Sequence, residues 1–139
     1  MENIKVLIVE DERIIAESIK LSLEKHDYQV CGIESWGEKV VESIQSTQPD
    51  LVLMDIMLRG KMSGVQTAKI INDEYDIPVI FLTSYSDDKT IEDAKKTFPY
   101  GYLVKPFEDR ELYATIEIAL YKHKTSKELE KYRNHLEQL

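Results

Sequence analysis

Apolar and polar residues alternate along the chain in blocks that predict five strand–helix units. Runs with apolar residues at consecutive positions are typical of strands buried on both faces, and they occupy 5–9, 28–33, 49–55, 77–84 and 101–107. Between them, apolar residues at helical spacing predict helices around 15–23, over 37–45 and 64–75, and from about Asp109 onward, with a more polar helix over 87–98. Alternating strands and helices favour a doubly wound α/β fold with a parallel sheet.

Polar side chains that can do chemistry stand where the predicted strands end. In an open parallel sheet, ligands bind beyond the carboxyl ends of the strands. These positions hold acids, hydroxyls and a lysine: Glu10, Asp11, Glu12, Asp55, Thr83, Ser84 and Lys105. We therefore expect them to converge in one site. Taken alone, the first three acids could also be acids favoured at a helix N-terminus, and the two hydroxyls could be helix caps.

Asp55 is the most informative of these residues because the apolar run "LVLM" leads directly into it. A buried carboxylate without a partner is costly. Clustered carboxylates share a proton or hold a cation, and oxygen ligands favour Mg²⁺ or Mn²⁺. A carboxylate can also attack phosphorus to form an acyl phosphate, with a metal ion and a lysine offsetting the charge. The residue types therefore fit metal-dependent phosphoryl transfer to Asp55.

Four motifs give the chain a specific resemblance. The segments "IVEDE", "LVLMDIML", "FLTSYSD" and "GYLVKPF", in this order, resemble the receiver domain of two-component response regulators over roughly Ile4 to Tyr121. The resemblance implies a flavodoxin-like fold, with five parallel strands in the order 2-1-3-4-5 and helices on both faces of the sheet. It also implies a cytoplasmic phosphorylation switch that catalyses only its own phosphorylation and dephosphorylation.

The resemblance assigns roles to the residues at the strand ends. Asp55 would be the phosphoacceptor, loaded by a histidine kinase or a phosphotransfer protein. Mg²⁺ would be bound by Asp11, by Asp55 and by the backbone carbonyl of Met57, with Glu10 in an outer position that reaches the metal through water. Lys105 would pair with Asp55 and then with its phosphoryl group.

The same resemblance predicts how the signal would leave the site. Thr83 would turn toward the phosphoryl oxygen, and Tyr102 would turn inward to fill the vacated space. In the family this pair changes the face made by the fourth helix, fifth strand and fifth helix. The Lys105–Pro106 bond is commonly cis there. The loop "LRGKMSG" departs from the usual family pattern, which makes Arg59 and Lys61 candidates for contact with the kinase.

Two rival functions use the same residues differently. One is a Mg²⁺-dependent phosphohydrolase with an aspartate nucleophile, which usually carries a second acid two residues later; Met57 occupies that position here. The other is an interaction module on the same fold that works without phosphorylation, against which the intact acids, Thr83 and Lys105 argue. Stoichiometric labelling, turnover or no reaction with a phosphodonor would separate the three functions.

Charge and composition narrow the range of partners. Formal net charge is −8, from 26 acids and 18 bases, so a phosphate backbone would be repelled and we expect no direct nucleic-acid binding. Cys31 is the only cysteine, which excludes an internal disulfide. No apolar run approaches the ~20 residues of a membrane helix, so we expect no membrane association. The three histidines are interpreted as solvated: His26, His123 and His135.

The last residues have a different character from the predicted receiver domain at 1–121. Over 122–139 we expect a helical extension or connector, because no Gly or Pro interrupts it. Four apolar residues lie at the three–four–three spacing of a coiled-coil seam: Leu129, Tyr132, Leu136 and Leu139. The sequence thus predicts that the stripe pairs with a second tail or with a sensor or kinase domain of the parent protein. A homodimer is possible through this extension or through the face of the fourth helix, fifth strand and fifth helix. A frayed, solvated extension is the alternative.

Overall fold

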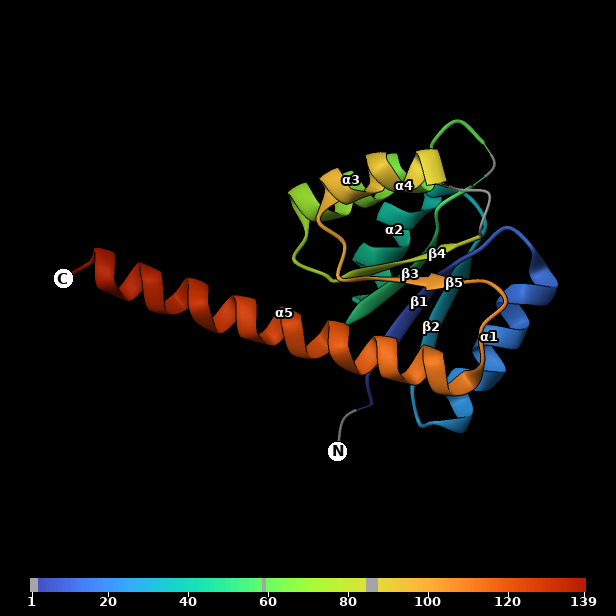
Figure 1. The fold of residues 1–139 in the computed structure, drawn as a ribbon, viewed down its shortest axis with the longest axis horizontal. Coiled ribbons are helices and arrows are strands. Elements are labelled where there is room, and N and C mark those ends of the chain that lie inside the picture. Colours follow the sequence, from blue (N-terminus) through green and yellow to red (C-terminus); the bar gives the residue numbers. More distant parts are fainter. Residues whose placement is uncertain (1–2, 59, 85–87) are drawn as a thin grey trace.

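The computed structural model describes residues 3–58, 60–84 and 88–139. Five parallel strands form one sheet in the order β2-β1-β3-β4-β5 (Figure 1). Their bounds are β1 Lys5–Val9, β2 Gln29–Glu34, β3 Leu51–Asp55, β4 Val79–Thr83 and β5 Gly101–Val104. The predicted doubly wound α/β fold, with flavodoxin-like strand order, is confirmed.

Within the described residues, five α-helices cover the sheet on both faces: α1 Arg13–Lys25, α2 Gly37–Thr47, α3 Gly64–Glu74, α4 Asp88–Ala94 and α5 Asp109–Glu137. Figure 1 shows α1 and α5 on one side of the sheet and α2, α3 and α4 on the other. Each layer has its own apolar core: Ile19 and Ile116 belong to the first, and Val40 and Ile71 to the second. Every residue of β3 and β4 is buried, as the consecutive apolar runs predicted.

The polar helix predicted over 87–98 is shorter than expected. The α-helix covers Asp88–Ala94 and continues as the 3₁₀ turn Lys95–Thr97. It ends at Phe98, whose backbone adopts the left-handed conformation with φ of 54°. A residue in this conformation cannot continue the hydrogen bonding of a right-handed helix, and Pro99 follows it.

Helix α5 is the longest element, with 29 residues. Its first half is packed on the sheet through Leu112, Ile116 and Ala119. Its second half projects away from the sheet, and the C-terminus lies far from the domain (Figure 1). The predicted continuity of the last helix is therefore observed. No helix within 3–58, 60–84 and 88–139 is both long enough and apolar enough to cross a membrane.

Candidate functional site

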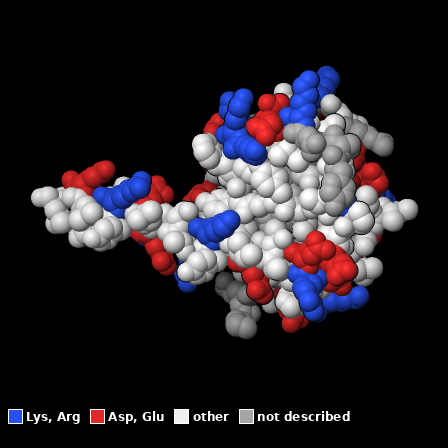
Figure 2. Space-filling model, in the orientation of Figure 1, with Lys and Arg blue, Asp and Glu red and all other residues white. Residues whose placement is uncertain are grey.

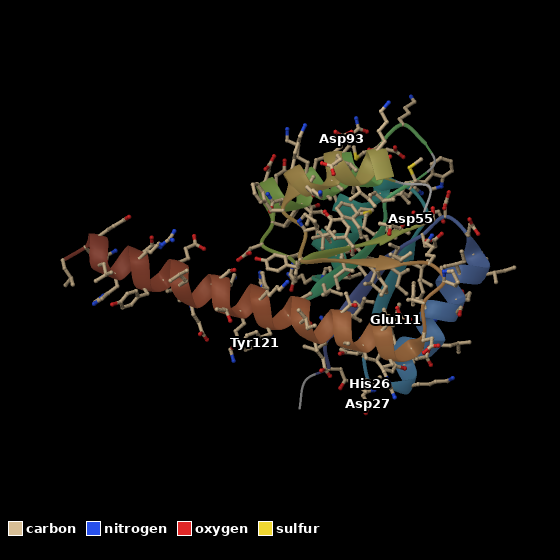
Figure 3. All side chains as sticks on the ribbon, viewed as in Figure 1. His26, Asp27, Asp55, Asp93, Glu111 and Tyr121 are labelled. Carbon is tan, nitrogen blue, oxygen red and sulfur yellow. The ribbon has the colours of Figure 1, made fainter. Side chains whose placement is uncertain are left out.

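The site lies at the carboxyl edge of the sheet, where strand register brings together residues distant in sequence. Asp55 ends β3 and pairs with Leu82 of β4, while Val104, the last residue of β5, pairs with Thr83. Glu10 follows β1 directly and Lys105 follows β5 directly. The strands end at the same level because they are parallel and in register, so the predicted convergence of their end residues is observed. Asp55 lies at this edge in Figure 3.

Lys105 bridges two carboxylates from two other strands. Its Nζ lies 2.9 Å from Oε2 of Glu10 and 3.0 Å from Oδ2 of Asp55. The Glu10 side chain is fully buried, and the side chains of Asp55 and Lys105 are 8% and 20% exposed. Two charge-assisted hydrogen bonds at this depth fix the ammonium between the carboxylates. The peptide bond between Lys105 and Pro106 is cis, as the resemblance implied.

Burial and hydrogen bonding shift the pKa values of Glu10 and Lys105. Burial raises the pKa of Glu10 to about 7; the Asp55 carboxylate adds to the rise and Lys105 opposes it. For Lys105, burial disfavours the ammonium, but hydrogen bonds to Glu10 and Asp55 outweigh it and raise its pKa above the ordinary value. Lys105 therefore stays charged at neutral pH, whereas Glu10 can exchange a proton in this range.

Three acids at this edge are close enough to share a cation. Ligand oxygens of Glu10, Asp11 and Asp55 lie within 4.8 Å of one another. Asp11, Asp55 and Lys105 also line a pocket of about 410 Å³, together with Met57 and Ser84. This set of hard oxygen donors, with room for water beside it, fits Mg²⁺.

The backbone around Asp55 holds its carboxylate in place. The amide of Met57 donates to Oδ1 of Asp55 at 3.0 Å, which leaves Oδ2 to Lys105. Gly64, the first residue of α3, lies so close that an added Cβ would be 2.2 Å from the Asp55 carbonyl oxygen. Ser63 caps α3 by accepting from the amide of Gln66. The end of β3 and the start of α3 are thus in direct backbone contact.

The loop after Asp55 is held by α2, a contact that sequence reasoning missed. Oε1 of Glu38 accepts a hydrogen bond from the Met62 amide at 2.6 Å. Gly60 has φ of 97°, and an added Cβ would be 2.6 Å from the Trp36 ring. The only signal in the sequence was a glycine in the loop, which does not reveal what lies against it. Arg59 is outside the described residues, and Lys61 is exposed.

The two predicted switch residues occupy neighbouring strands. Thr83 is buried at the end of β4, one residue before Ser84, and Ser84 rather than Thr83 lines the pocket. Tyr102 of β5 packs beside Phe81 with ring centroids 6.1 Å apart. The Tyr102 hydroxyl is buried, and within the described part of the chain it has no hydrogen-bond partner. A buried hydroxyl without a hydrogen-bond partner costs free energy, so the Tyr102 ring is not in its most favourable position.

One histidine differs from the solvated state that the sequence suggested. Nε2 of His123 lies 2.9 Å from Oδ1 of Asp76, and its ring contacts Tyr100 edge-on at 5.5 Å. Its side chain is 17% exposed. His26 is exposed but stacks on Tyr113, with ring centroids 4.0 Å apart. These contacts depend on where α5 passes, which local sequence does not encode.

Comparison with known proteins identifies the class that this fold and site define. Residues 6–117 match the family model of the response regulator receiver domain. The chain therefore belongs to the response regulator receiver domain family.

Two curated relatives are transcriptional regulatory proteins of Bacillus subtilis (strain 168). YdfI is 33% identical over 117 residues, which cover 84% of this chain and 54% of YdfI. YvrH is 36% identical over 131 residues, which cover 92% of this chain and 54% of YvrH. The chain thus spans about half the length of these two relatives.

A solved structure extends the comparison to the fold. The signal receiver domain of a modulated diguanylate cyclase from Desulfovibrio desulfuricans G20 superimposes with a TM-score of 0.85 at 39% identity. The match covers 90% of this chain and 99% of that domain. Receiver domains of this type belong to the response regulators of two-component systems.

Proposed function

We propose that the chain accepts a phosphoryl group on Asp55 from a histidine kinase or a phosphotransfer protein. The observation that supports this most is the arrangement of Asp55: its carboxylate lines the pocket, with Lys105 bound to Oδ2 and two further acids beside it. A structural ion pair would not need the two further acids, and a simple metal site would not need the lysine. The proposal includes Mg²⁺ dependence and a cytoplasmic location.

The transfer itself needs little covalent chemistry from the protein. An Asp55 carboxylate oxygen attacks phosphorus, the bond between phosphorus and the donor histidine nitrogen breaks, and the product is an acyl phosphate. The Lys105 ammonium, 3.0 Å from Oδ2, stabilises negative charge on the transferred group. Mg²⁺, held by Asp11, Asp55 and the Met57 carbonyl with Glu10 in an outer position, would supply the remaining charge neutralisation.

The output of the site is proposed to pass through Thr83 and Tyr102. Their backbones lie on hydrogen-bonded strands, since β4 and β5 pair Phe81 with Tyr102 and Thr83 with Val104. The Tyr102 hydroxyl has no hydrogen-bond partner among the described residues, which favours a second position for this ring. A phosphoryl group shifts this equilibrium only by its different interaction with the two states. The readout surface would be the face of α4, β5 and α5.

The rival phosphohydrolase is less well supported by the geometry. Such enzymes usually carry an acid two residues after the nucleophile, and this position is Met57, which is 55% exposed. The rival interaction module leaves the buried carboxylates unexplained, because burying them without a use is costly. The favoured function is therefore a switch that turns over only its own phosphoryl group.

Intact-mass measurement after incubation with acetyl phosphate and Mg²⁺ tests the proposal. We expect one phosphoryl group per chain, lost in Asp55→Asn and sharply reduced without Mg²⁺. Asp27→Asn is the matched control, because Asp27 is exposed and its φ of 63° suits asparagine. Equal labelling of Asp55→Asn and wild type would reject Asp55 as the acceptor, and release of phosphate without labelled protein would favour the phosphohydrolase.

A further inference from the structure

The projecting half of α5 carries an apolar face that nothing in the described chain covers. Four large apolar side chains lie on it, with exposed fractions of 52% for Leu129, 60% for Tyr132, 49% for Leu136 and 88% for Leu139. We propose that a second copy of this chain covers this face, as a parallel, in-register, two-stranded coiled coil. This inference rests on α5 and its surroundings and is independent of phosphorylation at Asp55.

Helix α5 has two different faces along its length. Successive residues of an α-helix are rotated by roughly 100°, so Leu112, Ile116 and Ala119 share one side, which is buried against the sheet. The exposed apolar residues follow the opposite side, beginning inside the domain region with Ile118, which is 53% exposed. A helix that served only as the last element of the domain would need only the face that is buried against the sheet. The second face is a separate apolar stripe.

The stripe has the period of a coiled coil. Placing Leu129 and Leu136 at heptad position a puts Tyr132 and Leu139 at position d. The same register puts Thr125 and Ile118 at d toward the domain. A seven-residue repeat of this kind is sustained by a partner helix, whereas packing onto a sheet needs no such period.

Charges beside the stripe favour a parallel partner in register. Glu128 occupies position g and Arg133 the following e position. In a parallel in-register pair, g of one helix lies beside the next e of the other, so Glu128 of each copy meets Arg133 of the other. An antiparallel pair places g opposite g and e opposite e, which removes this pairing. Figure 2 shows both signs of charge interspersed along the projecting helix.

Lys122, at position a, indicates how many helices the coiled coil contains. A single polar residue at an a position sets register and strand number at some cost in stability. In a two-stranded coil a lysine at this position can extend its ammonium to water along the apolar stripe. Three strands would enclose it more completely, so Lys122 favours two.

Contacts with the domain support the helix as far as Lys127, just before the four large apolar residues of the stripe. Asp76 accepts from Nε2 of His123 at 2.9 Å and lies 2.6 Å from Nζ of Lys127. His123 and Lys127 both lie on the domain side of α5, so their bonds to Asp76 leave the apolar stripe free. Beyond Lys127 the helix has only ten residues, and isolated helices shorter than ~12–15 residues are marginal in water. A second helix against the stripe would supply the missing burial.

A groove at the domain end of the stripe extends the same surface. It has a volume of about 470 Å³ and is lined by Phe98 and Tyr121 together with the seam residues Lys122 and Thr125. Phe98 is 74% exposed and Tyr121 72%. Tyr121 marks the place where α5 leaves the domain in Figure 3. The seam of a parallel pair would run from this groove to the end of the described helix.

Sedimentation equilibrium on the 139-residue chain tests the strand number and the charge pairing. A coil of this length is expected to be weak, so the concentration range should extend to about 1 mM. We expect a monomer–dimer equilibrium. Glu128→Arg or Arg133→Glu alone should raise the dimer dissociation constant by roughly tenfold, and the double exchange should restore it. Glu130→Arg, at outward position b, is the matched control and should leave it unchanged. A monomer throughout, a trimer, or no rescue by the double exchange would overturn the proposal.

Disulfide formation tests the direction and register independently. In a Cys31→Ser background, Tyr132→Cys places identical cysteines at d in both copies, where a parallel in-register pair brings them within bonding distance. Asn134→Cys, at the outward position f, is the control. We expect rapid oxidation to a covalent dimer for the first variant only. Equal rates for the two, or no dimer from Tyr132→Cys, would exclude the parallel in-register arrangement.

Discussion

The two ends of this molecule handle exposed and buried groups in opposite ways. At the carboxyl edge of the sheet, the ionisable side chains of Glu10 and Asp55 are withdrawn from water and bonded to Lys105. At the far end, the projecting part of α5 leaves Leu129 and Leu136 half exposed. Charge is buried where chemistry is expected, and apolar surface is exposed where a partner is expected. Each departure from ordinary burial therefore indicates a function.

Helix α5 itself carries both buried and exposed leucines, so matched leucine substitutions in it should show the largest difference in effect. Leu112→Ala removes a fully buried side chain and should lower the free energy of unfolding by about 2–5 kcal/mol. Leu136→Ala, in dilute protein, should change it by no more than about 0.5 kcal/mol. Urea unfolding followed by circular dichroism measures both. Comparable losses would mean that the projecting half is part of the domain's cooperative unit.

The contact between Asp55 and α3 should be nearly as sensitive. In Gly64→Ala the new Cβ would overlap the Asp55 carbonyl oxygen, at 2.2 Å, and the backbone must move. We expect a loss of roughly 1–3 kcal/mol together with slower labelling of Asp55. Gly32→Ala is the control, since its closest contact is the flexible Leu7 side chain at 3.1 Å. Normal labelling in Gly64→Ala would show that the α3 contact does not position the carboxylate.

Much of the fold and of the site followed from the sequence because both depend on local patterns and on a general rule. The apolar runs located the strands to within a few residues, and the parallel register then brought Glu10, Asp55 and Lys105 to one edge. The contact of Trp36 with Gly60 was missed because it joins two loops whose relative position is set by the whole sheet. His123 was misjudged for a similar reason: its partner Asp76 lies 47 residues away.

Two tyrosine hydroxyls can be compared directly, because one is hydrogen-bonded and the other has no partner among the described residues. The Tyr113 hydroxyl donates to the Ser22 carbonyl at 2.6 Å, whereas the buried Tyr102 hydroxyl has no partner among the described residues. Tyr113→Phe should cost about 1 kcal/mol, and Tyr102→Phe should be neutral or slightly stabilising. Thermal unfolding of the two variants decides this. A clear loss in Tyr102→Phe would show that its hydroxyl is bonded after all, which weakens its proposed second position.

The smallest expected effect concerns His123, where the domain meets the projecting helix. Burial lowers the pKa of His123 below its ordinary value, so the neutral ring donates to Asp76. The unfolded chain then binds the proton more readily, and this residue's contribution to stability is present above its ordinary pKa and lost as pH falls through the folded pKa. Tyr100 also faces the ring, and Lys127 binds the other carboxylate oxygen of Asp76.

Removing the neighbouring carboxylate should lower that pKa further, because Asp76 attracts the protonated ring. An NMR titration of the imidazole in wild type and Asp76→Asn measures the difference. Asp73→Asn, an exposed acid on α3, is the control and should leave the titration unchanged. A higher pKa in Asp76→Asn would mean that the contact between His123 and Asp76 is absent in solution.

The most direct test of the central claim is to locate the phosphoryl group on the chain. Borohydride reduces an aspartyl phosphate to homoserine with release of phosphate, which marks the acceptor permanently. After reaction with acetyl phosphate and Mg²⁺, followed by borohydride, peptide mass spectrometry should find homoserine at position 55 alone. Homoserine at Asp11 or at another acid, with Asp55 unmodified, would contradict the assignment of Asp55 as the phosphoacceptor.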